Sequence, residues 1–211
     1  MFKKIGLFIL LFSYQFAIAQ SNSQAEKVLT DLLNSAKSSA IKTSFKLLIS
    51  EKKDTQPQST SGTFTLKGTK FFLEMDAMKV WFDGKIQWSY VQQNNEVSIT
   101  EPTEKELSET NPMAILSGFK TKCIIRFSAK SKSEQNYCIE MIPKLKNNDV
   151  VKIEVQVNKN NGSLFLICVN NKNGSISKLI LTNFQKNIII SDNSFVFNSN
   201  KYKGVSVNDL R

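Results

Sequence analysis

The sequence predicts a mainly β protein, with an antiparallel sheet of about eleven strands that curls into a partial barrel and helices over its apolar face. Three observations predict this fold. Short segments that alternate apolar and polar residues follow one another about every 8–12 residues. Three dipeptides typical of tight hairpins lie between such segments. Only two helical segments are available to cover the apolar face, so we expect the sheet to curve around them.

The N-terminus has the layout of a secretory signal peptide. Two lysines precede an apolar run at 5–12, and a small-x-small pattern ends at Ala19. The run is too short for a permanent membrane-spanning helix, and no cysteine near Ala19 would accept a lipid anchor. We therefore expect residues 1–19 to be removed and 20–211 to form a single exported domain in the periplasm. The alternative is an N-terminal core helix.

The first element of the mature chain is predicted to be a helix over residues 23–38. Ser23 and Glu26 have the spacing of a capping box, in which each side chain satisfies a backbone donor. An apolar face then recurs at helical spacing, formed by Ala25, Val28, Leu29, Leu32, Leu33 and Ala36. This helix either packs on a sheet as part of the core or covers a cavity.

The apolar period then changes from that of a helix to that of a strand. A polar loop at 50–62 separates the first two of these segments. The expected strands are 44–50, 62–68, 70–75, 78–82, 85–91, 95–100, 121–130, 136–143, 150–157, 163–171, 175–184 and 187–192.

Glycine-containing dipeptides mark three hairpins, because two-residue hairpin turns require positive φ angles. They are Asp83-Gly84, Asn161-Gly162 and Asn173-Gly174. On the two sides of the first turn, we expect Val80 and Phe82 to point to the same apolar face of the sheet as Trp88 and Tyr90.

Residues 101–119 interrupt the strands. Asn111-Pro112 is a helix start with proline in the first turn, and Gly118 is a natural stop. The acidic residues before it, Glu101, Glu104 and Glu106, are either a carboxylate pair of the kind that cleaves glycosides or a solvated loop, and we favour the loop.

Most catalytic chemistry is excluded by composition. The chain has no histidine, which removes Ser-His-Asp and Cys-His catalysis and histidine-bound metals. Cys123, Cys138 and Cys168 are not at metal-binding spacing, and no phosphate-binding glycine pattern occurs. Cys123 and Cys138 lie on neighbouring expected strands, so they either form a disulfide or remain buried thiols. We expect no enzyme, no cofactor and no metal.

The chain is basic. Its net charge is +10, and it becomes +8 when the two lysines of residues 1–19 are removed. This balance favours acidic partners or anionic lipid head groups, or it is the charge of a solvated surface. An exported protein has no nucleic acid to bind.

Apolar surface is what remains for function. A curved sheet under a helical cover leaves an apolar space, the default site for an apolar ligand. Met75, Met78, Met113 and Met141, with fifteen phenylalanines in the chain, suit a pliable lining. The candidate lining residues are Leu29, Leu33, Leu47, Phe64, Leu66, Phe71, Leu73, Met75, Val80, Phe82, Trp88, Tyr90, Met113 and Leu116.

Several of these motifs together resemble the LolA-type periplasmic lipoprotein carriers, particularly their relatives in Bacteroidetes. The pattern Asp-Gly-Lys-x-x-Trp-x-Tyr occurs at 83–90, and Asn111-Pro112 opens a helical segment. The ending "FVFNSNKYKGVSVNDLR" at 195–211 is similar to the closing hairpin of that family.

The resemblance implies an unclosed antiparallel β-barrel with helices covering its concave face. It also implies a monomer whose cavity takes the acyl chains of lipoproteins from an inner-membrane ABC transporter complex and delivers them to the outer membrane, to an acceptor if one is present. Two alternatives use the same scaffold: a carrier of another lipid or glycolipid, and a domain that senses lipoproteins.

One departure from the family concerns the turn after the glycine strand. The better-known carriers have Lys-Arg-Pro there, with an arginine that helps to hold the helical lid closed. Here the turn reads Lys67-Gly68-Thr69. Lys67 or Lys70 can replace the arginine only in part, because an ammonium lacks the planar donor fork of a guanidinium.

Overall fold

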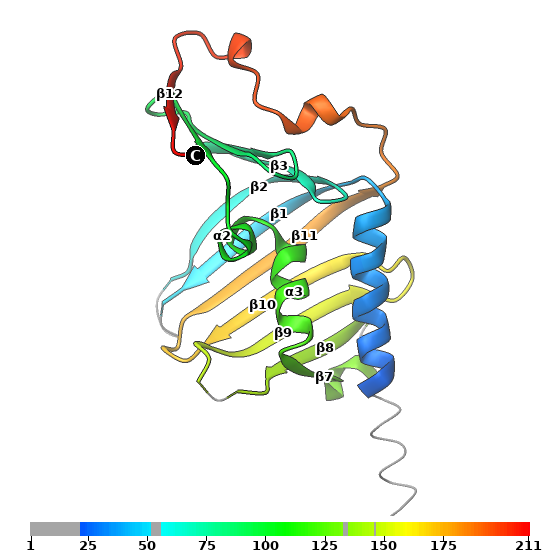
Figure 1. Cartoon of the computed structure of the whole chain (residues 1–211). Coiled ribbons are helices and arrows are strands. Elements are labelled where there is room, and N and C mark those ends of the chain that lie inside the picture. The colour runs from blue at the N-terminus through cyan, green and yellow to red at the C-terminus, as the bar shows by residue number, and fades with distance from the viewer. Residues whose placement is uncertain (1–21, 52–55, 133–134, 146) are drawn as a thin grey trace, which may run out of the picture.

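The computed structural model describes residues 22–51, 56–132, 135–145 and 147–211 (Figure 1). The expected signal peptide, 1–19, lies outside these residues. No helix in the described ranges is long and apolar enough to cross a membrane.

A twelve-stranded sheet dominates the described part of the chain, so the expected mainly β fold with an unclosed sheet is confirmed. The strand order is β12-β6-β5-β4-β3-β2-β1-β11-β10-β9-β8-β7. All neighbours are antiparallel except β12 and β6, which are parallel. The strands are β1 (Ile41–Ser50), β2 (Gln58–Lys67), β3 (Lys70–Met75), β4 (Met78–Phe82), β5 (Gln87–Val91), β6 (Glu96–Thr100), β7 (Cys123–Phe127), β8 (Asn136–Pro143), β9 (Val150–Asn158), β10 (Leu164–Asn171), β11 (Ile176–Lys186) and β12 (Ser206–Asp209).

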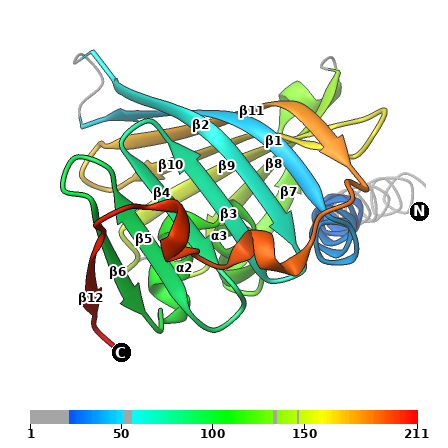
Figure 2. The ribbon, with the colours of Figure 1, turned by 90° about the horizontal axis from the view of Figure 1, so that it is seen from above.

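The helices lie on the concave side of this sheet. The N-terminal helix, residues 22–38, runs along one side of the curved sheet, and α2 (Glu104–Thr110) and α3 (Pro112–Lys120) lie inside the curve (Figures 1 and 2). Within the described ranges, three short 3-10 turns complete the fold, and they are η1 (Ala129–Lys132), η2 (Asp192–Phe195) and η3 (Ser199–Lys201).

The helix boundaries differ in part from those expected. Ser23 is already helical, so it does not cap the N-terminal helix. The acidic stretch expected as a loop contains α2, which begins with a capping box between Thr103 and Glu106. Asn111 and Pro112 start α3 as expected, but the helix continues past Gly118.

The three expected hairpins are present, with longer connections than two residues. Residues 83–86, 159–163 and 172–175 join the strands, and each connection contains a glycine with positive φ. In the first, the Asp83 carboxylate accepts the backbone N–H groups of Lys85 and Ile86, each at 2.8 Å. The aspartate side chain thus stabilises a four-residue turn rather than a two-residue one.

A bulge in β11 controls which of its side chains face the concave side. The register with β1 shifts between the pairs Lys42–Gln185 and Ser44–Thr182. Asn183 occupies the bulge with φ of 53°, and its Nδ2 donates to Ser44 Oγ at 3.2 Å. The extra residue turns Phe184 toward the concave side, although Leu181 three positions earlier already points there.

We expect Asn183→Val to lower the free energy of unfolding by about 2 kcal/mol, because a β-branched residue is strained at positive φ. Urea denaturation measures this loss. Asn183→Gly is the control, since glycine keeps the backbone angle and loses only the hydrogen bond to Ser44. An equal loss in both variants would attribute the effect to the hydrogen bond instead of the backbone.

The expected last strand, 187–192, is not a strand. Asn187 has φ of 59°, and the chain leaves the sheet at this point. Residues 187–211, called the C-terminal arm below, then cross the convex face and end in β12 (Figure 2). The expectation of a closing hairpin at 195–211 is therefore wrong. The last strand, β12, pairs in parallel with β6, which is distant in sequence.

Candidate binding cavity

The largest apolar cluster lies between the concave face of the sheet and the helices. Each strand from β1 to β4 and from β7 to β11 contributes buried residues to it, as does the N-terminal helix. On α3, Leu116 is fully buried and packs in this cluster, which fixes the middle of the helix. The first turn of α3 lies over a space that the side chains do not fill.

That space is an apolar cavity of about 200 Å³. Its floor comes from the central strands, and its roof comes from the junction of α2 and α3 at 110–112 with Ile115. Only four of its lining residues are polar or proline. The lining consists of Phe45, Leu47, Phe64, Leu73, Met75, Met78, Thr110, Asn111, Pro112, Ile115, Ile167, Val169, Ser177, Leu179 and Leu181.

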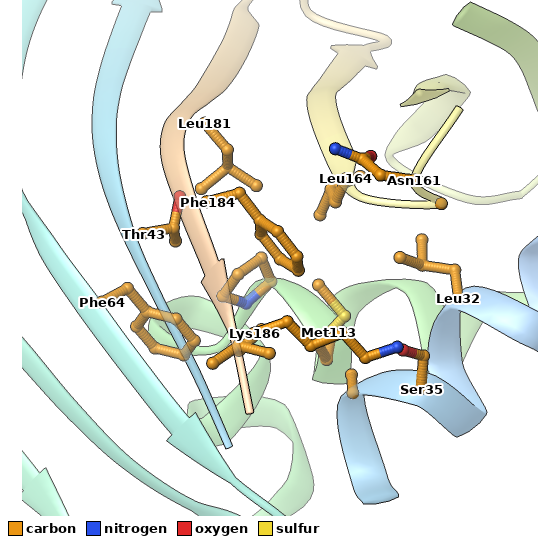
Figure 3. A pocket seen from close by; sticks show the side chains of 14 residues that line it. Leu32, Ser35, Thr43, Phe64, Met113, Asn161, Leu164, Leu181, Phe184 and Lys186 are labelled. Carbon is orange, nitrogen blue, oxygen red and sulfur yellow. The ribbon is translucent and has the colours of Figure 1, made fainter. Parts of the chain in front are cut away.

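Two further spaces adjoin it. A cleft of about 180 Å³ separates the N-terminal helix and β2 from α2 and α3, and Leu33, Leu66, Phe82 and Met113 line it. A gap of only about 20 Å³ remains beneath the N-terminal helix. In Figure 3, side chains from the N-terminal helix, α3 and several strands converge on this gap, among them Leu32, Leu164, Phe184 and Met113.

The start of α3 separates these spaces. Asn111 is buried and caps the helix, with its Oδ1 accepting the N–H of Met113 at 2.9 Å. Its own N–H donates to Leu107 O at 2.9 Å, which ends α2. One asparagine thus terminates one helix and begins the next, and this places Pro112 and Met113 between the cavity and the cleft.

The structure brings most of the predicted site residues together. Eight of the candidates line the cavity or the adjoining spaces: Leu33, Leu47, Phe64, Leu66, Leu73, Met75, Phe82 and Met113. Four pack in the same apolar cluster without lining any of these three spaces: Leu29, Phe71, Val80 and Leu116. The remaining two, Trp88 and Tyr90, lie elsewhere.

Trp88 and Tyr90 belong to a separate cluster on the convex face, with Trp81 and Val97. The expected phase across the Asp83-Gly84 turn is wrong. Phe82 pairs with Gln87, and Trp81 pairs with Trp88, so the apolar side of β5 is opposite to that of Phe82. Two residues that pair directly across neighbouring strands point to the same face of the sheet. In this hairpin each even-numbered residue of β4 pairs with an odd-numbered residue of β5, so Phe82 and Trp88 point to opposite faces.

The C-terminal arm covers this convex cluster. The ring of Phe197 lies 5.3 Å from that of Trp81, and the ring of Tyr202 lies 4.5 Å from that of Tyr90. Asn95 joins the two layers, because its Oδ1 accepts from Tyr90 Oη and its Nδ2 donates to Lys203 O, each at 3.1 Å. The aromatic pattern that drew attention in the sequence thus anchors the arm.

Sequence reasoning missed the cavity wall formed by the second half of the chain. Ile167, Val169, Leu179 and Leu181 line the cavity from β10 and β11. Their alternation within the expected strands 163–171 and 175–184 was a usable signal. These residues face the same cavity as those of β1 to β3 because β1 pairs with β11, and the sequence does not indicate this pairing.

The three cysteines are buried thiols, and no disulfide joins Cys123 to Cys138. Cys123 pairs across the sheet with Pro143, whereas Cys138 pairs with Gln156, which places them far apart along their strands. Burial raises the pKa of the Cys123 and Cys168 thiols, which disfavours the reactive thiolate.

The lysines at the turn that lacks the family arginine bind the C-terminal arm. Lys67 Nζ and Lys70 Nζ each lie 2.7 Å from a carboxylate oxygen of Asp192. Lys67 also donates to Ile190 O at 3.2 Å. These hydrogen bonds lower the pKa of Asp192 to about 2, from 3.8 in an unperturbed carboxyl group. The turn therefore fastens the arm beside the end of the N-terminal helix.

We expect Asp192→Asn to accelerate amide hydrogen exchange at 188–195, because it removes two charge-assisted hydrogen bonds. A lowered pKa means that the wild-type carboxylate contributes its full stability above about pH 4 and loses it as the pH falls through about 2. In the wild type, amide hydrogen exchange at 188–195, corrected for the intrinsic exchange rate at each pH, should likewise accelerate as the pH falls from about 4 to about 2.

Asp209→Asn is the matched control. Its carboxylate also has a pKa lowered to about 2, by Arg211, but it lies at the other end of the arm. Unchanged exchange in Asp192→Asn would show that the two lysines do not hold this segment.

A curved, unclosed sheet with an apolar cavity beneath helices is an architecture suited to binding an apolar ligand. The family described as "Outer membrane lipoprotein carrier protein LolA" matches residues 15–170, and the chain belongs to this family. Its scaffold is thus of the periplasmic lipid and lipoprotein carrier type.

Several solved structures are similar to this chain at low sequence identity, and the first one named here shares its fold. An uncharacterized conserved protein from Thermus thermophilus is 9% identical with a TM-score of 0.57, over 86% of this chain and 96% of that one. A DUF1329 family protein from Desulfovibrio piger is 11% identical with a TM-score of 0.48, over 87% and 99% of the two chains. A LolA superfamily protein from Nitrosomonas europaea is 11% identical with a TM-score of 0.43, over 80% and 97%. No curated protein matches the chain in sequence.

Proposed function

We propose that residues 20–211 form a periplasmic carrier that shields the acyl chains of lipoproteins and delivers them from the inner to the outer membrane. An inner-membrane ABC transporter complex would supply the cargo, and the outer membrane, with or without a protein acceptor, would receive it. The carrier performs no chemistry on the cargo. The observation that supports this function most is the apolar cavity of about 200 Å³ in a chain of this family.

The energetics of an acyl chain suit this cavity. Each buried methylene gains about 0.8 kcal/mol, so a long chain needs no specific polar contact to bind. Methionine side chains adapt to a mobile hydrocarbon, and Met75 and Met78 line the cavity wall. Release then requires only that the cavity open toward another apolar phase.

The cavity holds only part of such a chain. An engineered apolar cavity of about 150 Å³ accepts benzene, whereas pockets for larger ligands run from about 300 to 1,000 Å³. Residues 111–113 separate the cavity from the neighbouring cleft of about 180 Å³. Displacing this first turn of α3 would join the two spaces into a site of suitable size.

Mass spectrometry of bound ligand tests the proposal. The protein is expressed with its leader in a Gram-negative host, isolated from the periplasm without detergent and analysed intact. Triacylated peptide supports the carrier function. Free lipid or glycolipid as the sole ligand would assign the cavity to the other lipid-binding alternative, and a protein without ligand that also binds no fatty acid would contradict both.

A further inference from the structure

An apolar ridge projects from the start of the C-terminal arm, at the end of the molecule where the cleft opens. It consists of three consecutive isoleucines, residues 188–190. Ile189 is fully exposed, and the isoleucines beside it are partly exposed. A single exposed isoleucine is ordinary, but this one lies at the centre of an apolar run whose other two members are also in part exposed to water.

The ridge is held in place. The N–H of Ile188 donates to Ala40 O at 3.2 Å, and the carbonyl of Ile190 accepts from Lys67 Nζ at 3.2 Å. Both neighbours of Ile189 are therefore anchored to the body of the protein. Ile189 lies between these two anchored residues, with its side chain exposed to solvent.

Lysines lie beside the ridge. Lys37, Lys67 and Lys70 line an open cleft with Asp192. We call these three lysines the basic rim. One carboxylate, Asp192, opposes them in this cleft, so the rim retains a net positive charge.

The basic rim also borders the acyl-binding region. Lys37 and Gly68 line both the open basic cleft and the apolar cleft of about 180 Å³ beneath α2 and α3. The end of β11, the β2–β3 hairpin and the C-terminal end of the N-terminal helix meet at this place (Figures 1 and 2). A surface that contacted the ridge would therefore face the mouth of the cleft.

We propose that this end of the molecule docks on a bilayer that contains anionic phospholipid, with Ile189 entering the interface and the basic rim contacting the head groups. An anionic bilayer binds a protruding apolar side chain that is flanked by cations. The free energy of burying the apolar side chain adds to that of attracting the cations to the head groups. Docking would bring the cleft to the membrane at the moment of loading or release. The inference deepens the proposed carrier function and depends on it for its purpose.

Vesicle flotation tests the docking. Wild-type protein is mixed with vesicles of phosphatidylcholine alone or with phosphatidylglycerol, at low and high salt. We expect binding only to the vesicles with phosphatidylglycerol, and weaker binding at high salt. Equal binding to both vesicles, or binding to neither, would overturn the proposal.

Two pairs of variants locate the contact. Ile189→Asp should lower vesicle affinity at least fivefold, whereas Leu145→Asp, at another exposed apolar residue in the β8–β9 connection, should not. Lys37→Gln should lower affinity about fivefold, since each lysine near an anionic surface is worth about fivefold. Lys172→Gln, which removes the same charge elsewhere, should have a smaller effect. Equal losses within either pair would contradict this site.

Fatty-acid binding keeps this test separate from that of the proposed function. Ile189 lines neither the cavity nor the cleft, so Ile189→Asp should bind a fluorescent fatty acid as well as the wild type does. Vesicle binding without fatty-acid binding would refute the carrier function alone. Size-exclusion chromatography that showed a wild-type dimer and a monomeric Ile189→Asp variant would assign the ridge to self-association and overturn the membrane proposal.

Discussion

Leu47→Asp is expected to reduce acyl-chain binding more than tenfold while the protein stays folded. Leu47 is half-buried on β1 and lines the cavity. In the empty protein a carboxylate at this position reaches water through the cavity. A bound hydrocarbon would exclude that water, and burying an unpaired polar group costs about 1–3 kcal/mol, with a higher cost for a charge. Titration with a fluorescent fatty acid measures the loss.

Leu48→Asp is the control for this prediction. It lies on the same strand with similar burial but points to the opposite face, where it pairs with Lys178. Its fatty-acid affinity should equal that of the wild type, and urea denaturation should show both variants folded. Equal affinity in the two variants would remove the cavity from the proposed function.

The alternation of apolar residues predicts strands well, because each strand records locally which residues are buried. It does not label the two faces. The face of Trp88 depends on the register between β4 and β5, and an antiparallel pair with an even connection places Phe82 opposite Gln87. The register of this one hairpin therefore places Trp88 and Tyr90 on the convex surface instead of in the cavity.

The elements that sequence reasoning missed are those whose stability comes from distant contacts. The helix α2 offers only Leu107 to the apolar cluster, so its apolar period is weak, and its capping box is the local signal. The strand β12 is exposed along its whole length and exists because it pairs with β6. The run 187–192 is apolar enough for a strand, yet the anchored ridge at its centre has no strand beside it.

The C-terminal arm has a structural role that follows from this topology. It covers the aromatic side of β4 and β5, and its last strand occupies the edge of β6. Edge strands with unpaired backbone groups promote aggregation, and added pairing protects them. The arm therefore allows β4 to β6 to carry the apolar residues Trp81, Tyr90 and Val97 on the convex face.

Trp81→Ala is expected to lower the free energy of unfolding by about 3–5 kcal/mol, because truncation of a buried aromatic residue leaves a large cavity. Trp81 is buried between β3 and the arm, with ring-centre distances of 5.1 Å to Phe72, 5.3 Å to Phe197 and 6.0 Å to Tyr202. Urea denaturation gives the loss, and limited proteolysis should show earlier cleavage within the arm, since its aromatic partner is gone.

Trp88→Ala separates the contact with the arm from aromatic burial in general. Trp88 pairs directly with Trp81 across β4 and β5 but is only half-buried, so the expected loss is smaller, about 1–2 kcal/mol. Fatty-acid affinity should stay at the wild-type level in both variants, because neither residue lines the cavity. Equal destabilisation would mean that the arm adds nothing to the burial of Trp81. A loss of fatty-acid binding in a folded Trp81→Ala protein would mean that the convex cluster and the cavity are energetically coupled through β4, whose Phe82 lines the adjoining cleft.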